Sequence, residues 1–354
     1  MKQCYFIGVD AHCPFSEMTA VDRDGQVIRR DRCDTSIPAL VKMLDSVPRP
    51  RFLALEESSL ADWLYRNLRS HVDELTVCEP RRNRLIASDG DKDDDVDAEK
   101  LAQLLRGGYL KSVHHPESLA QAVFKQHVNL YHDRVRKRVR EAHGISALLK
   151  RHGVMARERH FAKPEDRPAL LAKLPAGLLQ EDMQSLWRGY DQVAALEMEF
   201  RKRLVSVARQ YDVTKRFEAL PGMGWIRAAT LFAYLDTPWR FQNKAALWKY
   251  LGIGLERRRS GNGPTRLAVP KYVNRLLKST ILGAAKSAVL QGENPFADLA
   301  RRWTEQGLSP RLVRRSVARS LSATMWGLWK NGSEYRPEWV GVAAAAIPGI
   351  KESC

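Results

Sequence analysis

The sequence has few cysteines, no long hydrophobic stretch and no surplus of acidic residues. Its longest apolar run, residues 339–350, is too short to span a bilayer and contains Pro348. No signal-peptide pattern is present at the N-terminus, so we expect a soluble, cytoplasmic protein without a membrane partner. The cysteines show neither Cys-x-x-Cys pairs nor histidines at zinc spacing, which excludes a disulfide scaffold and a zinc finger and is typical of reduced thiols. They are Cys4, Cys13, Cys33, Cys78 and Cys354.

Basic residues are present in large excess. The chain of 354 residues has 58 Lys+Arg against 41 Asp+Glu, a formal charge of +17. Such a surplus implies a polyanionic partner, and nucleic acid is favoured over membrane because no basic amphipathic or lipid-anchor signal accompanies it. The length predicts two or three domains.

Two predicted strands each end in a carboxylate. Residues 5–9 form a short, nearly all-apolar run, typical of a strand buried on both faces, and the run is followed by Asp10. Residues 52–55 form a second such run, followed by Glu56. A carboxylate at the end of a central strand has no packing reason to be there, so both are candidate site residues. Around them the pattern predicts strands at 15–21, 26–30 and 75–78, and helices at 37–44 and 60–68.

An acidic stretch follows, with four carboxylates in positions 93–97. Like charges at neighbouring positions repel and raise each other's pKa. If a helix begins here, Asp94 and Asp97 lie on one face within one turn. Together with carboxylates from elsewhere, they would suit a pair of hard divalent cations. The alternative is an acidic first helical turn that complements the helix dipole, with Asp93 or Asp94 as the cap.

These segments resemble a known family, the DEDD-type (RuvC-like) insertion-sequence transposases, whose characterised members are bridge-RNA-guided recombinases, and the related Piv-like DNA invertases. The resemblance is carried by residues 6–10, 53–56 and 92–98. It implies an α/β RNase H-like (RuvC-like) catalytic domain over residues 1–115. It also implies two Mg²⁺ or Mn²⁺ ions, held by Asp10, Glu56, Asp94 and Asp97. The family usually has Glu-Ala-Thr-Gly where this chain has Glu56-Glu57-Ser58-Ser59, so Glu57 stays an alternative ligand.

Residues 116–210 predict a basic helical arm. Residues 119–149 are free of proline and carry apolar residues at helical intervals, and the helical pattern resumes at 186–207. We expect two long helices that pack as an antiparallel pair or coiled coil. A basic cluster in the first helix predicts contacts with a phosphate backbone, and the alternative is a solvated basic face. The cluster is Arg134, Arg136, Lys137, Arg138 and Arg140.

Residues 211–335 predict a mainly α-helical C-terminal domain, followed by a tail at 336–354. A Pro-Gly-x-Gly turn precedes a predicted helix at 226–235. It resembles a helix-hairpin-helix turn in which Gly222 and Gly224 leave backbone N–H groups to bind a phosphate; the alternative is a plain helix-entry turn. Further helices are expected at 244–251, 274–290 and 310–330.

A glycine-rich loop, residues 256–264, places Arg257, Arg258 and Arg259 directly before Ser260. The family resemblance continues here through Gly252-x-Gly254 and the Ser260-Gly261 pair, and it implies that Ser260 is a nucleophile. The arginines would then hold phosphate and favour the alkoxide. The alternative is a mobile surface loop.

The resemblance covers about residues 5–330 and implies a DNA transposase or site-specific recombinase. Its expected partners are donor and target DNA, a structured guide RNA and further copies of the chain, as a dimer or tetramer, in the cytoplasm at the nucleoid. Two alternatives stay open. One is a nuclease of the Holliday-junction resolvase type, which uses metal-activated water. The other is a non-catalytic nucleic-acid scaffold whose acidic cluster only caps a helix.

Overall fold

The computed structural model describes residues 3–79, 94–258, 266–268, 270 and 272–340, and the chain divides into two compact units, Met1–Ala122 and Val123–Cys354. For residues 94–96, 257, 258, 266 and 267 the description is limited to the backbone. Within these ranges, no helix combines the length and apolar character that a membrane crossing requires.

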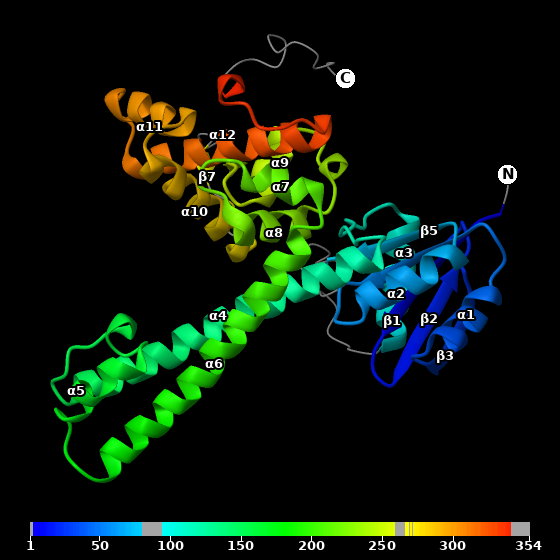
Figure 1. Ribbon diagram of the computed structural model, residues 1–354. Helices are drawn as coiled ribbons and strands as arrows, with labels where there is room; N and C mark the ends of the chain where they lie inside the picture. The colour runs from blue at the N-terminus through cyan, green and yellow to red at the C-terminus, as the bar shows by residue number, and fades with distance from the viewer. Residues whose placement is uncertain (1–2, 80–93, 259–265, 269, 271, 341–354) are drawn as a thin grey trace. The chain divides into compact units, whose positions relative to one another are not determined.

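The first unit is built on a five-stranded mixed sheet with the strand order β3-β2-β1-β4-β5 (Figure 1). The central strand β1 (Tyr5–Ala11) pairs antiparallel with β2 (Phe15–Val21), which pairs antiparallel with β3 (Val27–Asp34). On its other side, β1 pairs parallel with β4 (Arg51–Glu56), and β4 pairs parallel with β5 (Glu74–Cys78). Strands β1 and β4 are therefore neighbours that end at the same edge.

The two faces of this sheet are covered differently. Ile7, Val9, Leu53 and Leu55 pack into one hydrophobic cluster with α1 (Ile37–Asp45) and α2 (Ala61–Leu68). A 3₁₀ turn (Arg69–His71) follows α2. The opposite face is covered by α3 (Asp94–Arg106), which contacts β1, β2 and β4. Because side chains alternate along a strand, consecutive residues of β1 and β4 face different helices.

The second unit contains an arm made of two long helices, α4 (Leu119–Arg151) and α6 (Leu178–Ala208), which run side by side (Figure 1). The short helix α5 (Arg167–Leu171) and 3₁₀ turns at Glu158–His160 and Pro164–Asp166 connect them. A separate hydrophobic cluster, which includes Leu149, Phe161 and Trp187, holds the distal part of the arm together.

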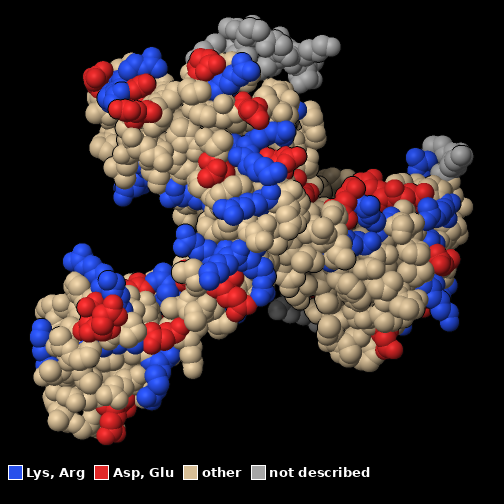
Figure 2. Space-filling model, in the orientation of Figure 1, with Lys and Arg blue, Asp and Glu red and all other residues tan. Residues whose placement is uncertain are grey.

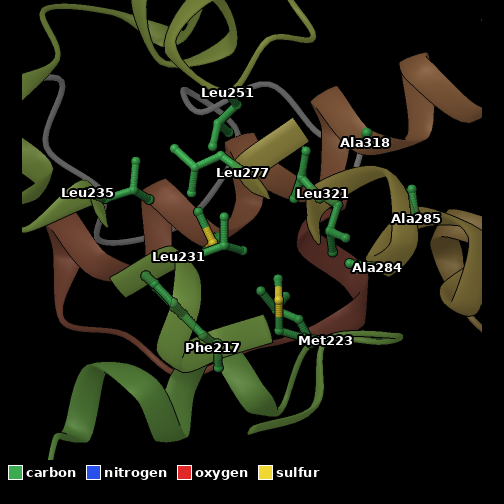
Figure 3. Packing of buried hydrophobic residues seen from close by; sticks show 14 of the residues in the cluster. Phe217, Met223, Leu231, Leu235, Leu251, Leu277, Ala284, Ala285, Ala318 and Leu321 are labelled. Atoms are coloured by element: carbon green, nitrogen blue, oxygen red, sulfur yellow. The ribbon is translucent and has the colours of Figure 1, made fainter. Parts of the chain in front are cut away.

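The rest of the second unit is a helical domain around one hydrophobic core. Its core includes Phe217, Met223, Leu277 and Leu321, which come from segments far apart in the sequence (Figure 3). The helices of this domain are α7 (Asp212–Glu218), α8 (Gly224–Leu235), α9 (Lys244–Tyr250), α10 (Arg275–Gln291), α11 (Pro295–Glu305) and α12 (Pro310–Asn331), with 3₁₀ turns at Pro238–Arg240 and Pro337–Trp339.

The prediction of an α/β N-terminal region followed by helical regions is confirmed. One local prediction needs correction. The predicted loop at 256–264 begins as a strand, β6 (Glu256–Arg258), which pairs antiparallel with β7 (Arg266–Ala268). Helices α7 and α11 were not predicted, although Asn294 caps α11 and Pro295 occupies its first turn, a recognisable start signal.

Candidate active site

Asp10 and Glu56 lie on the face of the sheet that α3 covers. In β1, Gly8 faces α3, so Asp10, two residues later, faces the same way. In β4, Ala54 packs with Leu101 of α3, and Glu56, two residues later in the strand, faces the same side of the sheet. The parallel register pairs Val9 with Leu55, so Asp10 and Glu56 come next along it. The sheet therefore places the two carboxylates on neighbouring strands and on one face.

The packing of α3 on β1 brings Asp97 to the same place. A Cβ atom on Gly8 would lie 2.0 Å from the carbonyl oxygen of Ala98 and 2.7 Å from the backbone nitrogen of Ala102. A glycine is therefore required for the helix to approach this closely. Asp97 directly precedes Ala98, and its side chain keeps 38% of its surface exposed, with Lys100 Nζ 4.0 Å from its Oδ1.

The electrostatics of Glu56 link the three carboxylates. Burial raises the pKa of the Glu56 carboxyl, and the negative charges of Asp10 and Asp97 raise it further. His12 acts in the opposite sense on this pKa, and its Nε2 lies 3.1 Å from Asp10 Oδ2. His12 was not predicted as a site residue, although it follows the last residue of β1 and lies only two positions after Asp10. The arrangement concentrates negative charge that a cation would neutralise.

The remaining predicted active-site residues are only partly placed. Asp94 is the first residue of α3, and its side chain lies outside the described atoms. Arg259 and Ser260 lie outside the described residues, and Arg257 and Arg258 are placed by the backbone of β6 alone. Among the side chains that the structure does describe, no three His, Cys, Asp or Glu residues could hold one metal ion together. The metal site therefore stays a prediction that needs Asp94 for its completion.

Glu57, the alternative ligand, contacts a different set of residues. Its Oε2 lies 2.7 Å from Nε2 of His115, whose Nδ1 lies 2.5 Å from Oδ1 of Asp62 on α2. This network is on the face of the sheet opposite to α3, as strand alternation requires for the residue after Glu56. Neither His115 nor Asp62 was predicted, because 53 to 58 positions separate the histidine from its two partners and no local pattern reveals such a contact.

Four of the five members of the basic cluster of α4 lie near acidic residues inside the arm. Arg138 contacts both Glu158 and Glu197, so its charge is used between the helices of the arm. The carboxylate of Asp133 lies near three of the basic side chains. Its Oδ2 is 3.8 Å from Nη2 of Arg134 and 3.2 Å from Nζ of Lys137, and its Oδ1 is 3.5 Å from Nη2 of Arg136. Figure 2 shows basic and acidic side chains mixed over the middle of the arm. The most exposed members of the cluster, Arg136, Lys137 and Arg140, remain the best candidates for phosphate contacts.

The glycines of the Pro-Gly-x-Gly turn have separate requirements. Gly222 has a φ of +74°, and a Cβ there would lie 2.3 Å from the carbonyl oxygen of Ala284 in α10. This glycine is needed for packing against α10, whether or not the turn binds phosphate. Gly224, the first residue of α8, has a φ of +62° and no atom within 4 Å of an added Cβ. Of the two, Gly224 alone has the open surroundings that the predicted phosphate contact requires.

Comparisons with known proteins agree with the family resemblance. A DEDD-type transposase family of IS110 elements matches residues 7–153, and the transposase family IS116/IS110/IS902 matches residues 214–300. The protein y4pF/y4sB of Sinorhizobium fredii, named as a transposase, is 25% identical over 345 residues, which cover 95% of this chain and 87% of that protein. The transposase for insertion sequence element IS1111A of Coxiella burnetii is 22% identical over 345 residues, which cover 95% of this chain and 92% of that protein.

The first match covers most of β1 and all of β4 and α3, the elements that carry Asp10, Glu56 and Asp97. The second runs through the helical domain from within α7 to within α11. The two curated relatives span nearly the whole chain, the arm included. The predicted family and enzyme class are therefore confirmed: the chain belongs to the IS116/IS110/IS902 family of insertion-sequence transposases, enzymes that act on DNA.

Proposed function

We propose that the first unit is an RNase H-like (RuvC-like) catalytic domain in which Asp10, Glu56, Asp94 and Asp97 are the metal ligands. The sheet order β3-β2-β1-β4-β5, with β1 antiparallel to β2 and parallel to β4, supports this fold. The observation that carries the proposal is that β1, β4 and α3 bring Asp10, Glu56 and Asp97 to one face of the sheet, close enough for Asp10 and Asp97 to add to the effect of burial on the pKa of Glu56. In this proposal residues 1–115 form the catalytic domain, 116–210 the arm, 211–335 the C-terminal transposase domain and 336–354 a tail.

The donor set suits Mg²⁺ or Mn²⁺, because these hard cations prefer carboxylate oxygens. Burial raises the pKa of Glu56, and the repulsion by Asp10 and Asp97 that raises it further is the kind that a bound cation relieves. When bound, two such ions would polarise the scissile phosphate and activate a nucleophile. Asp10 and Glu56 would contribute oxygens from the sheet edge, and Asp94 and Asp97 from the first turn of α3. In this proposal Glu57 is not a ligand, and its contact with His115 on the other face of the sheet supports that choice.

The proposed nucleophile is Ser260, on the strength of the family resemblance. Its oxygen would bond to phosphorus while the bond from phosphorus to the leaving deoxyribose oxygen breaks, and that oxygen would take up a proton. Arg257, Arg258 and Arg259 would hold the phosphate and stabilise its developing charge. The product is a serine–DNA adduct that a second DNA end resolves during strand exchange.

The formal charge of +17 suits an enzyme that holds DNA together with a structured guide RNA. Exposed basic residues of α4 and the turn at Gly224 would position the phosphate backbones without reading sequence. Because Ser260 is more than 160 positions from Asp97, we propose that the working enzyme is a homo-oligomer, a dimer or tetramer, that assembles on nucleic acid at the nucleoid.

The proposal is tested by cleavage of element-end DNA in the presence of Mg²⁺ and of RNA transcribed from the flanking sequence. Asp10→Asn or Asp97→Asn should abolish strand cleavage, because each removes a charge that the cations need. Binding of nucleic acid should stay within a few-fold of wild type, since the basic surface is intact. Full cleavage by either variant would contradict the proposed metal site. Unchanged transposition of the element in cells that carry either variant would favour a non-catalytic scaffold.

A second measurement separates the recombinase from a resolvase. Wild-type protein should form a covalent adduct with DNA that survives denaturing gels, and Ser260→Ala should lose both the adduct and recombination while still assembling with nucleic acid. Normal cleavage and joining by Ser260→Ala would assign the nucleophile to water, as in a Holliday-junction resolvase.

A further inference from the structure

His115 is a buried histidine that joins two carboxylates of the first unit. In the sequence it lies in the segment that connects α3 to α4, and its side chain is only 3% exposed. Burial opposes its charged form, but hydrogen bonds to Asp62 and Glu57 outweigh burial and raise its pKa to about 9. Both ring nitrogens therefore carry protons at neutral pH and donate to the two carboxylates. The ring of Tyr65 also packs against the imidazole, with centroids 5.4 Å apart.

The contact with Glu57 fixes the chain directly beside Glu56. The backbone N–H of Glu57 donates to the carbonyl oxygen of Cys78 at 2.9 Å, which extends the pairing of β4 with β5 by one residue. The side chain of Glu57 is held on the α2 face, so the side chain of Glu56 must leave the strand on the α3 face. Without this contact the end of β4 would fray, because a terminal residue has few other partners.

We propose that His115 is a positioning residue for Glu56: by holding Glu57 on the α2 face, it keeps the Glu56 carboxylate beside Asp10 and Asp97. The inference rests on the proposed function, in which Glu56 is a ligand. It gives the two consecutive glutamates separate roles, one in the site and one in its support. Residues that orient a ligand in this way commonly affect metal affinity by about 10- to 100-fold.

The two nitrogens of His115 offer a matched pair of variants. Glu57→Gln alters the hydrogen bond between His115 and the residue next to Glu56, whereas Asp62→Asn alters the hydrogen bond between His115 and α2. The two carboxylates are similarly exposed, at 41% and 43%. Calcium titrations followed by thermal unfolding report cation binding without turnover. We expect His115→Gln and Glu57→Gln to raise the Ca²⁺ concentration for half-maximal stabilisation by about 10-fold, and to raise the Mg²⁺ requirement of cleavage likewise. Asp62→Asn should change either value by less than about 2-fold.

Two further results decide the inference. The double variant His115→Gln/Glu57→Gln should be no worse than the single variants, because both act through one contact. If the Ca²⁺ concentration for half-maximal stabilisation rises equally in all three single variants, in proportion to the decrease in their melting temperatures, His115 only stabilises the fold. If His115→Gln does not fold, Glu57→Gln against Asp62→Asn gives the same decision.

Glu56→Gln distinguishes the failure of this inference from failure of the proposed function. If Glu56→Gln keeps the calcium-induced stabilisation of wild type, Glu56 is not a ligand and the proposed metal site is wrong. If Glu56→Gln loses the stabilisation but His115→Gln and Glu57→Gln titrate like wild type, the metal site stands and the positioning role of His115 is wrong.

Discussion

The acidic edge of the first unit and the basic cluster of the arm both stand out as like charges close together, but their charges are balanced in different ways. In the arm, Asp133 lies near three of the basic residues, and Arg138 contacts two glutamates. At the sheet edge, burial raises the pKa of Glu56, and the negative charges of Asp10 and Asp97 raise it further. The arm therefore balances much of its charge internally, whereas the sheet edge retains mutual repulsion.

This difference shows that the number of like charges is a weaker guide to a ligand site than the way they are balanced. A cluster whose members pair with neighbouring acidic residues is already largely neutralised, so it adds little attraction for a charged partner. A cluster held together by the fold despite repulsion is stabilised by an oppositely charged ligand. The comparison supports the proposal that the sheet edge is the reactive centre.

The largest expected effect comes from the glycines of the two regions. Gly8→Ala should cost about 3 kcal/mol or more, since its Cβ would overlap backbone atoms of α3, which cannot move without displacing Asp97. Gly144→Ala in α4 is the matched control, because no atom lies within 4 Å of its added Cβ and alanine favours a helix by about 1 kcal/mol. Chemical denaturation should therefore show opposite signs, and a neutral Gly8→Ala would contradict the close packing of α3.

The basic cluster can be divided by a salt titration. Replacing Arg136, Lys137 and Arg140 with alanine should lower the slope of log affinity against log salt by about two to three, near one per lost phosphate contact. Arg138→Ala should lower the melting temperature of the arm instead and leave that slope unchanged, because Arg138 is engaged by Glu158 and Glu197. An unchanged slope in the triple variant would place those side chains on a solvated face.

Two histidines sharpen the comparison through pH. The pKa of His115 is raised to about 9, so its stabilising contribution is complete below pH 6.5 and is lost as pH rises through 9. Burial, with help from Arg136, lowers the pKa of His132 in α4 to about 4, so the histidine keeps its neutral contact with Thr230 in the folded state, and the stability of the fold decreases as pH falls from 6.5 towards 4 because only the unfolded chain binds the proton. Melting temperatures measured against pH should flatten on the alkaline side in His115→Gln and on the acid side in His132→Gln. If both variants show the same dependence of melting temperature on pH as the wild type, the pKa shifts assigned to His115 and His132 are wrong.

The sequence was a good guide wherever a local pattern decides the structure. Apolar runs located β1 and β4 within one or two residues, and helical periodicity located α4, α8 and α10. The same runs made Asp10 and Glu56 candidate site residues, because a carboxylate that directly follows a buried strand has no packing reason to be there. Gly8 stood within the recognised segment, but its packing role appears only when α3 is placed on the sheet.

Long-range contacts could not be predicted in this way. The apolar run favours Glu56 over Glu57, but the contact that engages Glu57 on the other face of the sheet depends on His115, 58 positions away. Nor does a run of arginines show which member faces acidic residues of a second helix, as Arg138 does. Partner choice across a fold depends on the packing of whole elements, which a single sequence pattern does not contain.

The most direct test of the central claim compares Glu56→Gln with Glu57→Gln in Mg²⁺-dependent cleavage of element-end DNA, with DNA binding measured in parallel. Each substitution replaces one carboxylate oxygen with an amide NH₂ group, at adjacent positions, so the two variants have the same composition and net charge. We predict no detectable cleavage by Glu56→Gln at any Mg²⁺ concentration, and cleavage by Glu57→Gln that is restored as Mg²⁺ is raised, with DNA affinity within a few-fold in both. Cleavage by Glu56→Gln together with its loss in Glu57→Gln would contradict the assignment of the site.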